Sequence, residues 1–441
     1  MDAVLLSRIQ FGLAAGFHFI FPPLTLGLTL IIVIYETMFY RTEEAIYKSI
    51  SSFFIKILAL IFALGVATGI VLEFSFGTNW AEYSRVVGDI FGAPLAAEGI
   101  FAFFLESVFL GVILFGRKKV SRKFYLFATI MVFVGAHLSA LWILIANSWM
   151  QTPAGFAMEG GRAVMTDFFA AVFNPSTLVR FFHTIVAAWI TGSLFAAGIS
   201  AWYLLKERHV EQARKVIKTS LAIFIAMALL QFVSGHIHSV QVTQLQPEKM
   251  AAFEALWETT EGAPMSVIGI PIEDEQKTYF EIKIPKLLSL LAYFDPDAKV
   301  TGLNEFPRDE WPPVLLPYFS YHIMIGLGTL FALIAVISVV LMARRKLESS
   351  RWFLWALVLA IPLPHLANEF GWIAAEVGRQ PWAVYRVLKT SAAASVVVPA
   401  GQILFTLIMF FLIFTLLLVL FIFILTKLIS KGPEIGDDAG Y

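Results

Sequence analysis

The chain contains no cysteine among its 441 residues. Iron–sulfur clusters, covalently attached c-type haem and thiolate metal sites all require cysteine sulfur, so the sequence excludes each of them. Any redox centre in this chain must therefore use histidine, methionine or carboxylate ligands.

Charged residues are also scarce, at 15% of the chain, against about 25% in ordinary soluble proteins. Lys and Arg number 32, as do Asp and Glu, so the formal net charge is zero. Nucleic-acid-binding surfaces are markedly basic, and nothing here indicates one. Hydrophobic residues make up 59% and the mean hydropathy is +0.78, which is typical of a protein embedded in a lipid bilayer.

The apolar residues are gathered into roughly nine stretches, each long enough for the ~20 residues that a membrane-spanning helix needs. They begin near residues 11, 52, 94, 124, 178, 217, 314, 352 and 393. The first is not expected to be a signal peptide, because only Arg8 precedes it and no small-x-small cleavage site follows near Ile34. The sequence predicts an all-α, polytopic transmembrane bundle.

Lys and Arg in the short loops predict the orientation of that bundle. Basic clusters follow the third, fifth and seventh stretches, at residues 117–123, 206–218 and 344–351. The opposite loops are poor in cations or rich in Asp and Glu. We therefore expect the N-terminus outside, and the C-terminus, with Lys427 and Lys431, in the cytoplasm.

One segment, residues 240–312, breaks the membrane pattern with prolines and acidic side chains. It separates a predicted first group of six helices, residues 1–239, from a group of three, residues 313–441. A connection this long is usually functional or disordered, and we interpret it as a functional extramembrane loop. Its start predicts a short amphipathic helix, with Pro247 in the first turn and Met250 and Phe253 at helical spacing.

Few side chains within the predicted spans could bind a metal or carry a proton, and each is a functional hypothesis. His18, His183, Met324 and Glu369 are expected in the outer third of their helices, on the side of the long loop. A histidine there could instead be bonded to a neighbouring helix, and a buried methionine is more often core filling than a ligand. The presence of several side chains able to bind haem iron at a similar depth in the membrane nevertheless favours redox chemistry.

Two carboxylates in the third stretch, Glu98 and Glu106, are eight residues apart, which is about two helical turns. Ser139 and Asn147 in the fourth stretch have the same spacing and are expected to line the same seam. Carboxyl groups stacked in apolar surroundings suit proton transfer; the alternative is that each carboxylate is paired with a cation or bonded to polar side chains. Glu98 is expected in the outer third with the ligand candidates, and Glu106 deeper.

Taken together, these residues and several motifs resemble subunit I of the cytochrome bd quinol oxidases. The motifs are GAPLAAEGIFAFFLES from Gly92, HLSALWILIANSWM from His137, QPEKMAAFEALWET from Gln246 and NEFGWIAAEVGRQPW from Asn368, together with the helix of His18. The similarity extends over nearly the whole chain.

The resemblance implies three haems. His183 and Met324 would be the axial ligands of a six-coordinate low-spin haem b, whose Met/His ligation raises its potential. His18 and Glu369 would each be the single axial ligand of a further haem, one a high-spin haem b and the other the chlorin-type haem d. Haem d is assigned to His18, although the order differs among relatives.

The resemblance also implies that the loop binds quinol, at positions matching Lys249 and Glu254. A five-residue offset places these two about 140° apart on a helix, so that a joint contact needs side-chain reach or a bend; both could instead be solvated charges. Arg379, in the last motif, is counted among the catalytic residues. Two features depart from other members: His322 stands where some carry Arg, and the loop is of the short form.

The implied function is that of a terminal oxidase in a bacterial or archaeal cytoplasmic membrane. It would oxidise ubiquinol or menaquinol near the outer face, reduce dioxygen to water, and take protons from the cytoplasm along Glu98, Glu106, Ser139 and Asn147 without a pump. The resemblance implies a second large membrane subunit and often a small single-helix subunit.

Two other functions remain open on the residues alone. A dihaem cytochrome b of the quinol–cytochrome c type pairs histidines about four turns apart on two helices, which the eight histidines here do not do. A secondary transporter could use Glu98, Glu106 and Glu369 as proton or cation sites, but the chain shows no internal repeat.

Overall fold

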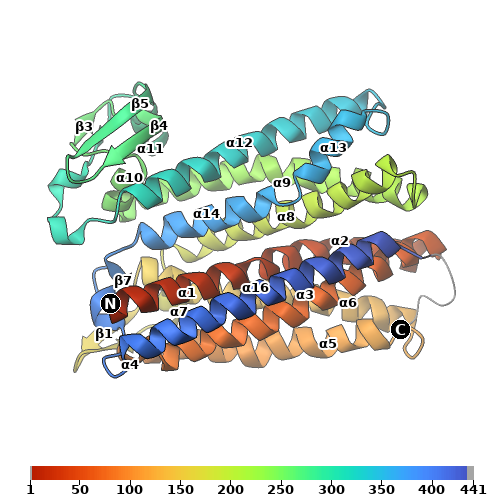
Figure 1. Ribbon diagram of the computed structural model, residues 1–441, viewed down its shortest axis with the longest axis horizontal. Helices are drawn as coiled ribbons and strands as arrows, with labels where there is room; N and C mark the ends of the chain where they lie inside the picture. The colour runs from red at the N-terminus through yellow and green to blue at the C-terminus, as the bar shows by residue number, and fades with distance from the viewer. Residues whose placement is uncertain (1, 435–441) are drawn as a thin grey trace.

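The computed structural model describes residues 2–434, which form a long bundle of helices with small β-hairpins at one end (Figure 1). Within this part of the chain, nine helical segments are long and apolar enough to cross a membrane. The predicted all-α transmembrane bundle is thereby confirmed.

The first span is a 40-residue segment, Ala3–Thr42, divided into α1 (Ala3–Phe19) and α2 (Phe21–Thr42). Pro22 and Pro23 occupy the first turn of α2. Proline has no amide hydrogen to bond to the preceding turn, so the helix is interrupted at Ile20. Asp2 accepts a hydrogen bond from the Val4 amide (2.9 Å) and caps α1, which is why the helix begins earlier than the predicted residue 11.

The third span is interrupted by a π-helix. It consists of α4 (Ala81–Ala97), the π-helical η1 (Glu98–Phe103) and α5 (Phe104–Phe115), with Pro94 inside the last turn of α4. Because proline has no amide hydrogen, the backbone hydrogen bond from residue 94 to the preceding turn is missing, shortly before the chain enters the wider π-helix.

The remaining spans pack around α8 (Thr177–Leu205), most of which is buried, whereas α16 (Ala400–Lys431) is mostly exposed. The others are α3 (Ala45–Gly77), α6 (Arg122–Gln151), α9 (Val210–Leu245), α12 (Leu315–Ala343) and the pair α13 (Arg351–Leu359) and α14 (Leu363–Val377). Helices α2 and α8 meet at Gly27 and Gly192, where a Cβ on Gly27 would lie 2.6 Å from the Ala188 carbonyl oxygen. Glycine thus permits the close approach of two spans.

The loop between α9 and α12 is a mixed structure rather than the purely helical one that an all-α fold implies. It starts with α10 (Pro247–Phe253), which confirms the predicted short helix, and contains α11 (Leu287–Tyr293), the hairpin β4 (Met265–Ile272) with β5 (Lys277–Ile284), and the strands β3 (Thr260–Glu261) and β6 (Lys299–Val300). Two 3₁₀ turns, Leu303–Glu305 and Arg308–Glu310, lead into α12. Because α9 continues to Leu245, the loop begins about five residues later than predicted.

Two other hairpins lie at the same end of the bundle as this loop and the start of α1, whereas α16 ends at the opposite end (Figure 1). They are β1 (Phe156–Glu159) with β2 (Arg162–Met165), next to α7 (Phe168–Val172), and β7 (Trp382–Val384) with β8 (Leu388–Lys389), followed by α15 (Thr390–Ala393). Gly160 and Gly161 form the turn between β1 and β2 with φ of 56° and 76°, values that favour glycine.

Candidate functional site

His183 is held with one ring nitrogen available as a ligand. Its Nδ1 lies 3.0 Å from Ser234 Oγ, and the Ser234 hydroxyl donates to the Gln231 carbonyl oxygen. A hydroxyl has one proton to donate, so Ser234 Oγ accepts from Nδ1–H. The Nε2 lone pair is then left for an electrophile; in this structure it accepts from the Gln231 amide nitrogen at 3.1 Å.

His18 has the same arrangement with different partners. Its Nδ1 lies 2.9 Å from Thr68 Oγ1, and the Thr68 hydroxyl donates to the Leu64 carbonyl oxygen at 2.8 Å. Thr68 therefore accepts from Nδ1–H and leaves the lone pair on Nε2. Metal-ligating histidines are typically oriented in this way by a hydrogen bond at the other ring nitrogen.

Each of the four ligand candidates lies against a glycine of a neighbouring helix. A Cβ on Gly69 would lie 3.2 Å from His18 Cε1, and one on Gly235 would lie 3.5 Å from His183 Cε1. The corresponding distances are 3.0 Å from Gly371 to Met324 Sδ and 3.2 Å from Gly16 to Glu369 Oε2. All four side chains remain partly accessible. Each of the four side chains is therefore packed closely against the backbone of a neighbouring helix, where a larger residue in place of the glycine would disturb it.

The candidates do not lie at one common depth along their spans. At 1.5 Å per residue, His183 is about 9 Å from the start of α8, Met324 about 14 Å from the start of α12 and Glu369 about 12 Å from the end of α14. His18 lies about 22 Å along its 40-residue span and Glu98 about 26 Å along its 35-residue span. Because α1 and α4 begin earlier than expected, His18 and Glu98 lie further from the ends of their helices than the other three. That all five lie in the outer third of the membrane stays a prediction.

A buried polar network joins three helices near the loop end of the bundle. Glu376 of α14 pairs with the buried Arg379 (2.6 Å) and lies 3.7 Å from the buried Arg180 of α8. Arg180 Nε and Arg379 Nη1 are both buried and have no acceptor within residues 2–434. One carboxylate thus faces two guanidinium groups, and these have more N–H donors than there are acceptors around them. Such an arrangement suits the binding of a further anionic group.

Asn147 belongs to this network and does not contact Glu98. Its amide nitrogen donates to Glu376 Oε1 (3.1 Å), and its Oδ1 accepts from Arg180 Nη2 (2.5 Å). Ser139, in contrast, donates to Glu98 Oε1 at 2.7 Å. The predicted common seam therefore divides into two groups, since Asn147 lies two turns further toward the loop end of α6.

Trp372 links the network to the first helix. The Arg180 guanidinium lies 5.6 Å from the centre of the Trp372 ring, and Phe19 packs edge-on against the same ring with centroids 5.2 Å apart. Phe19 follows His18, and Trp372 lies one turn after Glu369. Helix α14 thereby contacts both the His18 helix and the His183 helix.

The π-helix brings Glu98 and Glu106 closer to one face of their span. In a continuous α-helix, eight residues exceed two turns by about 80°. A π-helical turn contains more residues than an α-helical turn, so each residue of η1 rotates the chain by a smaller angle. The angle between the two glutamates around the helix axis is therefore smaller than about 80°. Glu106 is buried against Gly135 of α6 and forms no hydrogen bond with another described residue. Glu73 of α3, which the sequence interpretation missed, lies near enough to interact electrostatically with Glu98.

Lys249 and Glu254 occupy separate surroundings rather than one contact site. The buried Lys249 Nζ donates to Gln246 Oε1 (2.7 Å) and Gln151 Oε1 (2.5 Å), and Gln151 donates to Glu376. Burial lowers the pKa of Lys249 well below its usual range, and the neighbouring Arg180 adds to this. Lys249 is therefore connected to the buried network rather than to bulk solvent.

Glu254 follows the end of α10 and faces β4. Its Oε2 accepts from the Ser266 amide (2.9 Å), while Oε1 is buried and has no hydrogen-bond partner within residues 2–434. Burial raises the pKa of this carboxyl to about 8. The alternative of two solvated charges is wrong, since the exposed fractions of Lys249 and Glu254 are 2% and 3%.

His322, the departure from the Arg found in some relatives, joins α12 to the loop. Its Nδ1 lies 2.8 Å from the Tyr318 carbonyl oxygen, and its Nε2 lies 2.8 Å from that of Ser266. Both ring nitrogens are thus engaged by backbone, and His322 holds β4 against the start of α12.

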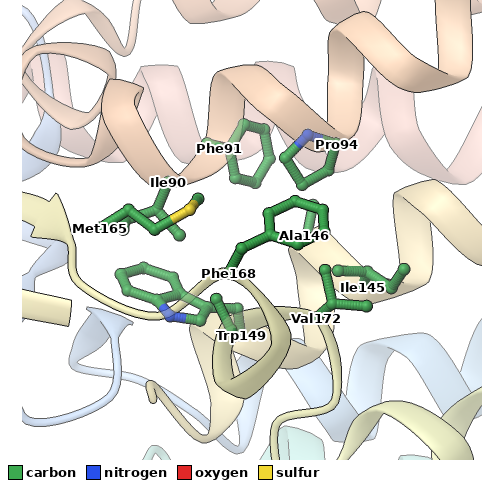
Figure 2. A pocket seen from close by; sticks show the side chains of 10 residues that line it. Ile90, Phe91, Pro94, Ile145, Ala146, Trp149, Met165, Phe168 and Val172 are labelled. Carbon is green, nitrogen blue, oxygen red and sulfur yellow. The ribbon is translucent and has the colours of Figure 1, made fainter. Parts of the chain in front are cut away.

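A small apolar cavity lies between α4, α6 and the segment around α7 (Figure 2). Figure 2 shows Phe91 and Pro94 on one side and Trp149 on the other. With a volume of about 10 Å³ it holds at most one water molecule. It is a packing defect and too small for a haem or a quinol.

Sequence reasoning missed several residues that complete the candidate site. Thr68, Ser234, Gln231, Gln151 and Glu376 are polar residues in or beside spans, and polarity alone could have marked them. Their partners, however, lie 48 to 229 residues away in the chain. Only helix packing brings them together.

Comparison with known proteins identifies similar chains over the whole length. Residues 6–433 match the profile of the family described as cytochrome bd terminal oxidase subunit I. The chain is 39% identical to cytochrome bd ubiquinol oxidase subunit 1 of Bacillus subtilis, covering 98% of this chain and 95% of that protein. It is 37% identical to cytochrome bd-II ubiquinol oxidase subunit 1 of Escherichia coli, with coverage of 98% and 97%.

A solved structure shares the fold. The bd oxidase from Geobacillus thermodenitrificans superposes with a TM-score of 0.92 at 30% identity, covering 98% of this chain and 99% of that one. The alignment with the Escherichia coli relative extends over 505 residues, so that protein contains segments with no counterpart among the 441 residues here.

Proposed function

The chain belongs to the cytochrome bd terminal oxidase subunit I family, and from that premise we propose that it holds three haems and oxidises quinol beside the loop between α9 and α12. It is a multi-pass membrane protein and part of a terminal quinol oxidase, a quinol:oxygen oxidoreductase. When bound, the haems supply electron transfer from quinol to dioxygen. The dihaem cytochrome b and transporter alternatives are thereby set aside.

The observation that carries the haem assignment is the shared orientation of His18 and His183, each with Nδ1–H bound by a hydroxyl and Nε2 left as the ligand atom. We assign His183 and Met324 to the low-spin haem b, His18 to haem d and Glu369 to the high-spin haem b. Each of these residues packs against a glycine of a neighbouring helix, which fixes the position of its side chain.

Arg180 and Arg379 are assigned to the haem propionates. Their buried, unpartnered donors require an anion in a region where Glu376 balances only one of the two cations. This gives Arg379 a binding role in place of the general catalytic role expected from its motif.

Quinol binds between Glu254 and the network that ends at Lys249. The Glu254 Oε1 atom binds one quinol hydroxyl, and the carboxyl in its ionised form accepts the hydroxyl proton and releases it toward the loop surface, on the outer side. Lys249, whose ammonium form is disfavoured by burial, positions the second quinol oxygen by donating a hydrogen bond. Ubiquinol and menaquinol both present the two oxygens that this arrangement requires.

Protons for oxygen reduction enter from the cytoplasm along α5 and η1. Glu106 receives the proton, and Glu98 delivers it, with its carboxylate oriented by the Ser139 hydroxyl. Asn147 orients Glu376 and Arg180 and so acts beside the haem propionates rather than in this path. Proton uptake and release on opposite faces generates a proton motive force without a pump.

The working enzyme contains a second large membrane subunit and, in some forms, a small single-helix subunit, within a bacterial or archaeal cytoplasmic membrane. Helices α3, α5 and α16 carry exposed apolar side chains that such subunits and lipid would cover.

The visible absorption spectrum of the purified complex tests the haem assignment, since a chlorin band in the red identifies haem d. A second experiment tests the quinol site with Lys249→Gln and Glu254→Gln. Both should lose quinol turnover and retain oxygen uptake with reduced phenylenediamine, while Lys277→Gln, on an exposed strand of the same loop, should retain both. Loss of both activities in the two loop variants would make their role structural.

A further inference from the structure

A polar cavity of about 280 Å³ lies at the end of the bundle opposite the β-hairpins. It is bordered by the end of α2, the start of α3, the turn after α5 and the start of α6. Four spans begin or end there, so the cavity lies at the level of the lipid headgroups on that face of the membrane. None of the proposed haem, quinol or proton-path residues borders it.

The floor of the cavity is a fixed ion pair. Glu36, 2% exposed, accepts hydrogen bonds from Arg117 and from the Ser51 hydroxyl. The Arg117 guanidinium also lies 4.2 Å above the centre of the Tyr125 ring. Because Glu36 neutralises only Arg117, the floor carries no surplus negative charge.

The rim carries the surplus positive charge. Lys48 and Lys118 border the cavity, and neither forms an ion pair with any residue between 2 and 434. Arg122 also borders it and shares its charge with Glu43 in an exposed pair, which contributes little because water screens it. At least two cations therefore face a cavity with no balancing acid among the described residues.

The wall of the cavity is apolar. Phe39 and Leu126 are partly buried, and the 42%-exposed Tyr40 stands at the rim. On the adjoining turn of α6, Phe124 and Phe127 are 42% and 46% exposed. A ligand that fits would combine an anionic group with an apolar tail directed along the helices.

We propose that this cavity binds the phosphodiester headgroup of an anionic phospholipid, with Lys48 and Lys118 contacting the phosphate and the acyl chains lying along α2 and α6. Basic pockets between the ends of spanning helices are suited to such headgroups, and each cation near an anionic surface contributes to attraction. Inorganic phosphate shares the charge of the headgroup but has no apolar tail to contact Phe39 and Leu126.

The test uses the complete detergent-purified complex placed in nanodiscs of phosphatidylcholine with a minor fraction of phosphatidylglycerol. Lipids retained after re-extraction are counted by native mass spectrometry. The variants are Lys48→Gln/Lys118→Gln, the charge-conserving Lys48→Arg/Lys118→Arg, and the control Lys119→Gln/Lys123→Gln, whose lysines are exposed at the same end outside the cavity. Millimolar inorganic phosphate is added as a competitor in a parallel series.

Wild type, the Arg variant and the control should retain phosphatidylglycerol in preference to phosphatidylcholine. In the Gln variant the ratio of retained phosphatidylglycerol to phosphatidylcholine should fall at least about tenfold, while the haem content stays the same. Inorganic phosphate should not displace the lipid. Equal retention in the Gln variant, loss in the Arg variant, displacement by phosphate alone, or loss of a partner subunit in place of lipid would each overturn the proposal.

Discussion

At the scale of single residues, two hydroxyl groups determine which nitrogen of each candidate haem-ligand histidine carries the proton. We predict that Thr68→Val and Ser234→Ala each weaken haem retention by about 10- to 100-fold, because the ring loses the partner of Nδ1–H. Haem content after gel filtration and dilution measures this. Thr68→Ser should behave as wild type, and Ser338→Ala, which removes a buried hydroxyl of α12 bonded only to its own helix, is the matched control.

Met324 offers a second residue-scale test. Met324→Leu should keep the fold, since such a swap usually costs under about 1.5 kcal/mol, while the low-spin haem becomes high-spin or loses potential. Met342→Leu on the same helix should change neither the spectrum nor the midpoint potential. An unchanged low-spin spectrum in Met324→Leu would remove this residue from the ligand set.

The Glu254 carboxyl makes the stability of the loop depend on pH. Its folded pKa of about 8 exceeds the ordinary value of 4.5, so the folded state keeps a proton that the unfolded chain releases. Stability from this group is full below about pH 4.5, falls as pH rises and is lost above about pH 8. The apparent Tm of Glu254→Gln relative to wild type should therefore increase across this window, by the equivalent of a few kcal/mol. A difference that is constant with pH would contradict a buried neutral carboxyl.

At the scale of elements, the π-helix η1 places the two carboxylates of the third span on one face. Glu106→Gln keeps the size and hydrogen bonding of the side chain but cannot ionise, so haem content and quinol binding should survive while turnover and proton uptake fall. Flow-flash reoxidation with a pH-sensitive dye measures the uptake. Glu82→Gln, which changes a partly exposed glutamate paired with Arg85 in the first turn of α4, is the control. Uptake at the wild-type rate in Glu106→Gln would exclude this residue from the path.

The end of helix α10 determines which neighbours Lys249 and Glu254 contact. Helix α10 ends at Phe253, so Glu254 points toward β4 while Lys249 points toward α6 and α9. The two side chains, expected to be about 140° apart on one helix, therefore contact different parts of the protein: Lys249 contacts Gln151, and Glu254 contacts Ser266. This arrangement is the basis of our proposal that the two residues contact different oxygens of one quinol.

At the scale of the whole molecule, the absence of cysteine allows a direct test of orientation. Lys119→Cys, in the turn after α5, and Asp274→Cys, whose native side chain is fully exposed on the loop, each introduce a single thiol. A membrane-impermeant maleimide applied to intact cells should label Asp274→Cys and leave Lys119→Cys unlabelled until the membrane is opened. The reverse pattern would invert the assignment of quinol oxidation to the outer face.

Composition and local pattern determined what kind of protein this is. Nine apolar stretches predicted nine spans, because a backbone in lipid must satisfy its hydrogen bonds within each helix. The short helix at Pro247 followed from local signals as well. The motifs likewise identified the family and the four ligand candidates, since these residues are distinctive in type and neighbourhood.

Only the tertiary structure decided what those residues contact. Asn147 bonds Glu376, 229 residues away, rather than joining Ser139 and Glu98, and the tautomers of His18 and His183 depend on hydroxyls of other helices. The depth of His18 depended on where α1 begins and on the break at Ile20. Periodicity specifies which face of a helix is apolar, but the rotation and partner of each helix are set by packing against its neighbours, where glycines permit close approach.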